Sequence, residues 1–310
     1  MTRSHPSRLG VAMDLNTLRA FVVLAEEEHM TRAAERLHLT QPAISNKLKR
    51  LEAELSHPLF HRTPKGLTLT EAGEIFLVYA QEAIHTVEKG EEALQALGGL
   101  LRGKLSVGAG ATATHYLLPA LVGGFHADYP GVQMFIKEQG SQTTLEDVLE
   151  GKLDLGIVTL PRDGHVERRF HQQLLIRDWV KDELVLYLPR NHVLMTQQTF
   201  RWEDLQDERM VLFEAGSAVR DMIDTQLKKT NTTPHVVMEL RSIEASKKMV
   251  EQGIGGAFLS RYAMDEEHVL HCEDASLTRQ LAIIHKKNRI MSPAVKTFLG
   301  YMLASKGPEE

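Results

Sequence analysis

One short stretch of the chain places small, amide-bearing and basic side chains at spacings suited to contacts with nucleic acid. A helix is predicted from Gln41 to Glu54, because apolar residues recur along it and just after it at steps of three and four and so share one face: Ile44, Leu48, Leu51 and Leu55. The outer face then carries Gln41, Ala43, Ser45, Asn46, Lys47, Lys49 and Arg50. Short and amide side chains can read base edges in the major groove while Lys and Arg contact phosphates. A merely solvated basic face would show the same periodicity.

The sequence around this helix predicts how it is positioned. Residues 30–37 predict a shorter preceding helix, with Ala33, Ala34 and Leu37 on its packing face. After a break at residues 38–40, the hydroxyl of Thr40 can accept a hydrogen bond from the first turn of the second helix. Pro42 is tolerated in that turn because the amide it lacks would have no helical partner there. The pattern therefore predicts two packed helices, the second with its polar face outward.

The residue order from Ala33 to Arg62 is more specific than its periodicity. The order AAxxLxxTQPAxSxxLxxLExxLxxxLFxR, followed by Thr-Glu-Ala-Gly at 70–73, resembles the winged helix-turn-helix of LysR-type transcription regulators over residues 15–75. The resemblance implies that the second helix is a recognition helix that lies in the major groove. It implies DNA contacts from the helix pair and the wing: Thr31, Gln41, Pro42, Ala43, Ser45, Lys47, Arg50, Arg62, Thr63 and Lys65. A serine is frequent in the family where this chain has Ala43.

Composition restricts the classes of protein that the whole chain can belong to. Its 310 residues, 43% hydrophobic and 25% charged, are ordinary for a globular protein of two or three domains. The net charge of -5 argues against a general nucleic-acid coat. Basic charge is nevertheless concentrated in residues 41–66, which contain five basic and two acidic residues: Lys47, Lys49, Arg50, Arg62 and Lys65, and Glu52 and Glu54.

Cysteine usage and hydropathy predict the compartment. The single Cys272 cannot form an internal disulfide, and no stretch approaches the ~20 apolar residues that a membrane helix requires. We therefore expect a cytoplasmic protein with no membrane partner. Residues 1–12 lack the apolar core of a signal peptide and are interpreted as a disordered leader, with Met13 as an alternative start to Met1.

A long helix is predicted over residues 71–101, between the winged helix-turn-helix (13–70) and the remaining chain. Its stripe of mainly apolar residues begins with Ile75, Val78, Tyr79, Glu82, Ile84 and Val87, and Leu94, Leu97 and Leu101 continue it beyond Gly90. Such a stripe on a linker helix favours packing against a partner helix, and so a homodimer or homotetramer. A dimer would present two recognition helices to half-sites about one DNA turn apart. The alternative is that the stripe packs against the chain's own domains.

Beyond residue 101, short apolar strands alternate with helical segments, which predicts an α/β fold with a parallel sheet covered on both faces. The layout resembles the two-lobed, periplasmic-binding-protein-like effector domain of the LysR-type family. We assign residues 104–174 and 277–303 to lobe I, 175–276 to lobe II and 304–310 to a tail. The sequence GAGATATHYLLP at residues 108–119 most resembles the matching segment of regulators of carbon-fixation or sulfur-assimilation operons.

Hydroxyl side chains follow the predicted strands unusually often. In open α/β sheets, ligands bind beyond the carboxyl ends of the strands. The candidate effector-binding residues are Thr112, Thr114, Ser141, Thr143, Thr159, Ser217 and Ser242. Any one of them could be only a helix N-cap. Together, at helix N-termini with free amides, they predict a small polar, anionic effector held between the lobes. In the family, positions matching Thr112, Thr114, Ser141 and Thr159 commonly line this pocket.

The main alternative is an enzyme that binds a dinucleotide such as NAD. Residues 108–113 match GxGxxA after a predicted strand, and Glu138 ends the next strand where a ribose ligand could lie. The match is isolated, however, and Pro119 interrupts the helix that should follow. No His or Tyr/Lys pair is spaced for hydride transfer.

Other catalytic and metal-binding chemistry finds little support in the sequence. GxSxG, GxxxxGK[ST] and HExxH motifs are missing, so we expect no enzyme activity, cofactor or metal. His57 and His61 straddle Pro58, which predicts turn or wing positions instead of a shared metal. Glu273 and Asp274 are of the wrong sign to activate Cys272 as a nucleophile, which disfavours redox sensing. We therefore expect a sequence-specific transcription regulator whose effector alters the arrangement of its lobes and thereby its bound DNA.

Overall fold

The chain forms two compact units, Met1–Leu94 and Gln95–Glu310. The computed structural model describes residues 13–63, 66–96, 101–160, 168–197, 199–264 and 269–305. The expectations for the leader (1–12), for Lys65 and for tail residues 306–310 lie outside these ranges. Within them, no helix is long and apolar enough to cross a lipid bilayer.

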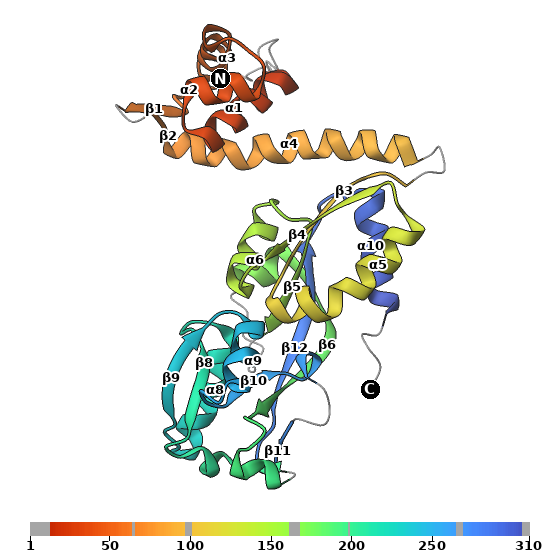
Figure 1. The fold of residues 1–310 in the computed structure, drawn as a ribbon. Coiled ribbons are helices and arrows are strands. Elements are labelled where there is room, and N and C mark those ends of the chain that lie inside the picture. Colours follow the sequence, from red (N-terminus) through yellow and green to blue (C-terminus); the bar gives the residue numbers. More distant parts are fainter. Residues whose placement is uncertain are drawn as a thin grey trace, which may run out of the picture. The chain divides into compact units, whose positions relative to one another are not determined.

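The first unit packs a helical cluster against a small β-wing (Figure 1). Its described elements are α1 (Leu15–Glu27), α2 (Met30–Arg36), α3 (Gln41–Leu55), β1 (Phe60–Thr63), β2 (Gly66–Leu69) and α4 (Glu71–Ala96). The predicted core positions of α2 and α3 are buried together with Phe21 of α1 and Phe60 of β1: Ala33, Ala34, Ile44, Leu48 and Leu51. Thr40 caps α3 as predicted, because its Oγ1 accepts a hydrogen bond from the Ala43 amide.

Three residues explain why the wing follows α3 so closely. Oε1 of Glu52 accepts a 2.8 Å hydrogen bond from the Leu59 amide, which ties the end of α3 to the start of β1. The hydroxyl of Thr70 donates to the Pro58 carbonyl at 2.7 Å and accepts from the Gly73 amide at 3.0 Å. Gly73 must lack a side chain, since a Cβ there would lie 2.2 Å from the Leu59 carbonyl oxygen. The Thr-Glu-Ala-Gly stretch is thus the joint between wing and α4.

Helix α4 divides its apolar residues between two faces. Phe76, Leu77, Ala80 and Ile84 pack against the core of the first unit. Five of the residues predicted for the partner-facing stripe are instead exposed: Ile75, Val78, Tyr79, Val87 and Leu94. The expectation was therefore wrong for Ile84, whose position in the helical repeat faces inward. Leu97 lies outside the described residues, and Leu101 packs against the core of the second unit.

The second unit contains two lobes joined by long strands (Figure 1). Lobe I is built from β3 (Gly103–Ala109), the π-helical turn η1 (Ala113–Leu117), α5 (Leu118–Asp128), β4 (Val132–Glu138), α6 (Ser141–Leu149), β5 (Leu155–Leu160), α7 (Arg168–Gln173) and α10 (Pro293–Ala304). Helices α5 and α10 bury Phe125 and Phe298 against one face of its sheet. Helices α6 and α7 bury Val148 and Phe170 against the other.

Lobe II is built around shorter strands and the far ends of two long ones. Its own elements are η2 (Val193–Thr196), β7 (Thr199–Phe200), η3 (Trp202–Leu205), β8 (Arg209–Phe213), α8 (Ala218–Thr230), β9 (His235–Leu240), α9 (Ile243–Glu251), β10 (Ala257–Ser260), η4 (Arg261–Ala263) and β11 (His271–Cys272). The two long strands that it shares with lobe I are β6 (Leu174–Tyr187) and β12 (Leu277–Lys286). Trp202 stacks on Phe258 with ring centroids 4.9 Å apart in one cluster of its core.

The main sheet is mixed, which corrects the expectation of a parallel sheet. Its strand order is β10-β6-β12-β5-β3-β4. Strand β3 runs parallel to β4 and β5, and β8 runs parallel to β9, as predicted. Strand β12, however, is antiparallel to both β5 and β6. The reason is that β6 carries the chain from lobe I into lobe II and β12 brings it back, a reversal that strand–helix alternation does not reveal.

Candidate DNA-binding surface and effector pocket

The outer face of α3 presents the side chains that the sequence predicted. Gln41, Pro42 and Arg50 are exposed, while Ala43, Ser45 and Lys47 are half-buried. The start of α3 is positioned by its Thr40 cap and by Pro42, which falls within the first turn as expected. Because the opposite face is locked into the core, these side chains form a rigid outward surface with amides and hydroxyls towards its N-terminal half.

The other predicted DNA contacts lie on α2 and the wing. Thr31 is exposed in the first turn of α2, where its amide donates to Nδ1 of His29. Arg62 and Thr63 are exposed on β1, and the Thr63 hydroxyl donates to the Gly66 carbonyl across the wing at 3.1 Å. His57 lies in the turn after α3 and His61 on β1, so the two are not presented by one helix. The described residues include no cluster of metal-ligating side chains.

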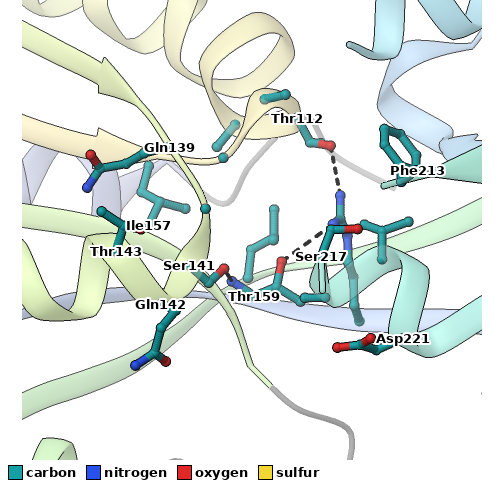
Figure 2. A pocket seen from close by; sticks show the side chains of 18 of the residues that line it. Thr112, Gln139, Ser141, Gln142, Thr143, Ile157, Thr159, Phe213, Ser217 and Asp221 are labelled. Atoms are coloured by element: carbon teal, nitrogen blue, oxygen red, sulfur yellow. Dashed lines mark hydrogen bonds between the residues drawn. The ribbon is translucent and has the colours of Figure 1, made fainter. Parts of the chain in front are cut away.

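A cavity of about 770 Å³ lies between the lobes of the second unit. It brings together five of the seven predicted hydroxyl residues: Thr112, Ser141, Thr143, Thr159 and Ser217. Strands β3, β4 and β5 are parallel and end at the same edge, so the residues following them meet there. Ser217 reaches the same cavity from lobe II, at the N-cap of α8. Figure 2 shows these side chains around the cavity.

Thr114 and Ser242 are not among the residues that line the cavity. The Thr114 hydroxyl donates to the Gly110 carbonyl one turn earlier. Ser242 caps α9, where its Oγ accepts from the Ala245 amide at 3.2 Å. Ser242 is therefore a helix N-cap, which is the alternative that the sequence had left open for each of these hydroxyls. Thr114 makes a different local bond, back to its own helix.

Arg279, a buried arginine on β12, also lines the cavity but was not predicted from the sequence. Its Nε and Nη2 atoms each lie 2.7 Å from Oδ2 of Asp182 on β6. Its Nη2 also donates to the Thr112 hydroxyl at 2.7 Å, and its Nη1 to the Thr159 hydroxyl at 3.4 Å (dashed lines in Figure 2). Asp182 is one of five charged residues within β6, so the available signal was Arg279 alone, a charged residue next to the apolar run of β12.

Formal charge around the cavity is nearly balanced. The charged lining residues are Glu138, Glu214, Asp221, Arg241 and Arg279. Oε2 of Glu138 lies 2.9 Å from Nε2 of His115, and Glu214 pairs with Arg241 at the exposed edge. Counting charges therefore does not tell which sign of ligand the cavity favours. Three helical N-termini, at Ala111, Ser141 and Ala218, contribute first-turn amides that have no helical acceptor.

Comparison with known proteins identifies both units. Residues 15–74 match the family described as bacterial regulatory helix-turn-helix protein, lysR family, and residues 98–306 match the LysR substrate binding domain. The chain belongs to the LysR family of transcription regulators. This LysR-type protein is thus a DNA-binding regulator with an effector-binding domain, as its sequence pattern predicted, and not an enzyme.

Curated relatives of this LysR-type regulator are described as regulators of RuBisCO transcription. A probable RuBisCO transcriptional regulator of Synechocystis sp. is 33% identical over 302 residues, covering 94% of this chain and 86% of that protein. One of the same description from Gracilaria tenuistipitata var. liui is 34% identical over 293 residues, covering 92% and 94%. The sequence resemblance to the carbon-fixation subgroup is thereby confirmed.

Solved structures share the fold of this LysR-type regulator. A full-length OxyR variant from Pseudomonas aeruginosa has a TM-score of 0.72 at 28% identity, covering 95% of this chain and 94% of that one. Full-length CbnR complexed with target DNA has a TM-score of 0.66 at 22% identity, covering 95% and 100%. The Synechocystis CcmR regulatory domain in complex with 2-PG has a TM-score of 0.58 at 24% identity, covering 66% and 98%.

The first glycine of the glycine-rich segment of this LysR-type regulator serves packing, contrary to the dinucleotide alternative. A Cβ on Gly108 would lie 2.4 Å from a Leu153 methyl and 3.1 Å from a Thr144 methyl. Gly108 therefore lets α6 and the loop after it pack closely on β3. Glu138, the candidate ribose ligand, is paired with His115. The relatives are transcription regulators, so the NAD-enzyme alternative has no support.

Proposed function

We propose that this protein regulates carbon-fixation genes in response to a small, polar, anionic effector bound between the two lobes of its second unit. Hydroxyl side chains from both lobes and three helical N-termini around one cavity are the observation that carries the proposal. Helix N-termini favour anions through free amides and the helix dipole. The curated relatives support the choice of target genes.

The effector class can be narrowed by analogy with the CcmR regulatory domain. That domain was solved in complex with 2-PG, or 2-phosphoglycolate, and its fold matches the second unit of this chain. A cavity of about 770 Å³ has room for an anion of this size together with ordered water. We take 2-phosphoglycolate as the first compound to test, as a representative of small phosphorylated carboxylates.

For the DNA-binding unit, we assign the outer face of α3 to base and phosphate contacts and the wing to flanking phosphates. The residues assigned to α2 and α3 are Thr31, Gln41, Pro42, Ala43, Ser45, Lys47 and Arg50, and those of the wing are Arg62, Thr63 and Lys65. We assign the exposed apolar residues of α4 to a homodimer or homotetramer, which would present paired recognition helices. Because the DNA is its partner, we place the protein in the cytoplasm.

Fluorescence anisotropy and calorimetry on the full chain test the proposal. The DNA would be a duplex from upstream of the protein's own gene, at ~0.15 M salt with excess nonspecific competitor. We expect saturable binding that survives competitor. We also expect saturable calorimetric binding of 2-phosphoglycolate, which shifts the DNA affinity or the extent of DNA bending.

Two outcomes would contradict the proposal in different ways. Loss of DNA binding on addition of competitor, for this duplex and for one upstream of RuBisCO genes, would refute the choice of target genes. Binding of a neutral metabolite in preference to 2-phosphoglycolate, glycolate and inorganic phosphate would refute the anionic effector. A Ser217→Val variant, which alters the cavity from lobe II, should keep its DNA affinity while losing part of the effector response.

A further inference from the structure

Four of the hydroxyls that line the cavity share a hydrogen-bond direction, whereas that of Ser260 donates to Asp182. The Thr112 hydroxyl accepts from Arg279 Nη2 at 2.7 Å, and the Thr159 hydroxyl accepts from Arg279 Nη1 at 3.4 Å. The Ser141 hydroxyl accepts from the Thr159 amide at 3.0 Å, and the Ser217 hydroxyl accepts from the Arg220 amide at 3.2 Å. In each case a protein donor occupies a lone pair of the hydroxyl oxygen.

This direction determines what each hydroxyl can offer to a ligand. A Ser or Thr hydroxyl has one hydrogen to donate and two lone pairs that accept. When a protein N–H occupies a lone pair, the hydroxyl hydrogen turns away from that donor. The described structure gives these four hydroxyls no protein acceptor for that hydrogen, so it can be donated into the cavity. Helix hydroxyls just outside the cavity do the opposite, since those of Thr114 and Thr144 donate to backbone carbonyls.

Arg279 is the source of this polarisation for two of the four hydroxyls. Its side chain is only 6% exposed, yet it lines the cavity, whereas its partner Asp182 is 0% exposed and does not. Asp182 is held in turn by the Ser260 hydroxyl, which donates to its Oδ1 at 2.8 Å. A buried guanidinium requires such a counter-charge. The Asp182 carboxylate does not reach the cavity, so the positively charged guanidinium is the part of the ion pair that faces a ligand.

We propose that Arg279 is the specificity-determining residue of the effector site, and that it selects anions by turning the Thr112 and Thr159 hydroxyls into donors. The inference rests on the proposed function, because it specifies how that site recognises charge. The matching ligand is a head group with several acceptor oxygens and no donors of its own, such as a phosphate or a carboxylate. Asp182 and Ser260 act as positioning residues that fix the plane of the guanidinium.

Arg241 provides a matched control on the same cavity. It also lines the cavity and carries the same charge, but its side chain is 86% exposed and pairs with Glu214. Among the described residues, Arg241 makes no hydrogen bond to a lining hydroxyl. If the overall positive charge near the cavity were what matters, Arg241 and Arg279 would contribute alike. If hydrogen-bond direction matters, only Arg279 should.

Removing Arg279 alone would leave Asp182 buried and unpaired, so the test uses a paired substitution. Arg279→Met together with Asp182→Asn removes both charges, and the asparagine keeps an oxygen that can accept from Ser260. Titration calorimetry on the full chain would measure 2-phosphoglycolate, inorganic phosphate and neutral glycolamide against the unaltered protein, the double variant and Arg241→Met. Circular dichroism and thermal unfolding would first show that each variant is folded.

We expect the double variant to bind 2-phosphoglycolate roughly 30-fold more weakly, because hydrogen bonds to a charged group are the strong ones. Its preference for the anion over glycolamide should collapse, while Arg241→Met stays within about threefold. Thr159→Val should weaken anion binding, and Thr159→Ser, which restores a hydroxyl, should recover it. A purely structural role for Arg279 would weaken both ligands equally and would leave the anion preference unchanged.

The remaining outcomes separate this inference from the proposed function. If a folded double variant binds 2-phosphoglycolate as well as the unaltered protein does, the role of Arg279 is refuted and the anionic effector stands. If the unaltered protein binds phosphate through Arg279 but not 2-phosphoglycolate, the selection of anions stands and the proposed effector class is refuted. If no anion binds to the unaltered protein, both are refuted.

Discussion

The DNA-binding surface and the effector pocket use polar side chains in opposite ways. On α3, residues such as Gln41 and Arg50 are exposed, and their positions are fixed by apolar neighbours on the same helix. In the pocket, Arg279 and Thr112 are buried and bonded to each other, with Asp182 behind them. A surface of the first kind can change without affecting the fold. A pocket of the second kind couples recognition to stability.

Asp182→Ala should show this coupling with the largest effect. The substitution leaves the Arg279 guanidinium buried without its carboxylate, and breaking a buried pair in this way costs about 3–5 kcal/mol of unfolding free energy. Both tryptophans, Trp179 and Trp202, lie in the second unit, so urea unfolding followed by tryptophan fluorescence reports on that unit. Glu251→Ala, which removes an exposed partner of Lys248, is the control and should leave the midpoint unchanged. Equal unfolding midpoints for the two variants would show that the buried pair of the pocket contributes no more to stability than an exposed pair does.

Thr112→Val should separate the two regions by function. Valine keeps the shape of the side chain but removes the acceptor for Arg279 Nη2, which leaves a buried donor unpaired at about 1–3 kcal/mol. We expect unchanged affinity for operator DNA in anisotropy and no response to the effector. Thr114→Val, at a hydroxyl outside the cavity, is the control and should retain the response. Loss of DNA binding in Thr112→Val would assign a structural role to Thr112.

The same difference explains what could be predicted from the sequence. The recognition face lies within the single helix α3, so spacing alone assigned both its buried and its exposed residues. The pocket is assembled from β3, α6, β5, α8 and β12, and only the rule that parallel strands end together made its hydroxyls predictable. Arg279 was missed because its partners Thr112 and Asp182 are 167 and 97 residues away in sequence. The antiparallel return of β12 was missed for the same reason.

Arg50→Ala tests the exposed region with a smaller expected effect. Arg50 lies exposed on the outer face of α3, where it can neutralise one phosphate without contributing to the core. We expect weaker binding to specific and nonspecific DNA alike, and a salt slope reduced by about one unit. Lys229→Ala on α8, in the second unit, is the matched loss of an exposed cation and should leave the slope unchanged. A slope unaffected by Arg50→Ala would exclude Arg50 from the phosphate contacts.

Cys272 belongs to neither region and should have the smallest effect. The pKa of its thiol is raised, and burial is the largest cause. The hydrogen bond that the thiol donates to Asp274 also raises the pKa, whereas the Ala275 amide, which donates to the sulfur, lowers it. A raised pKa leaves little thiolate at neutral pH, and thiolate is the reactive form. We expect alkylation, followed by mass spectrometry, to be slower than that of free cysteine at pH 7.5 and to accelerate as pH rises. Cys272→Ser should preserve DNA binding and the effector response. Rapid alkylation at neutral pH, or loss of regulation after mild peroxide treatment, would add a third, redox-sensitive region to the two compared above.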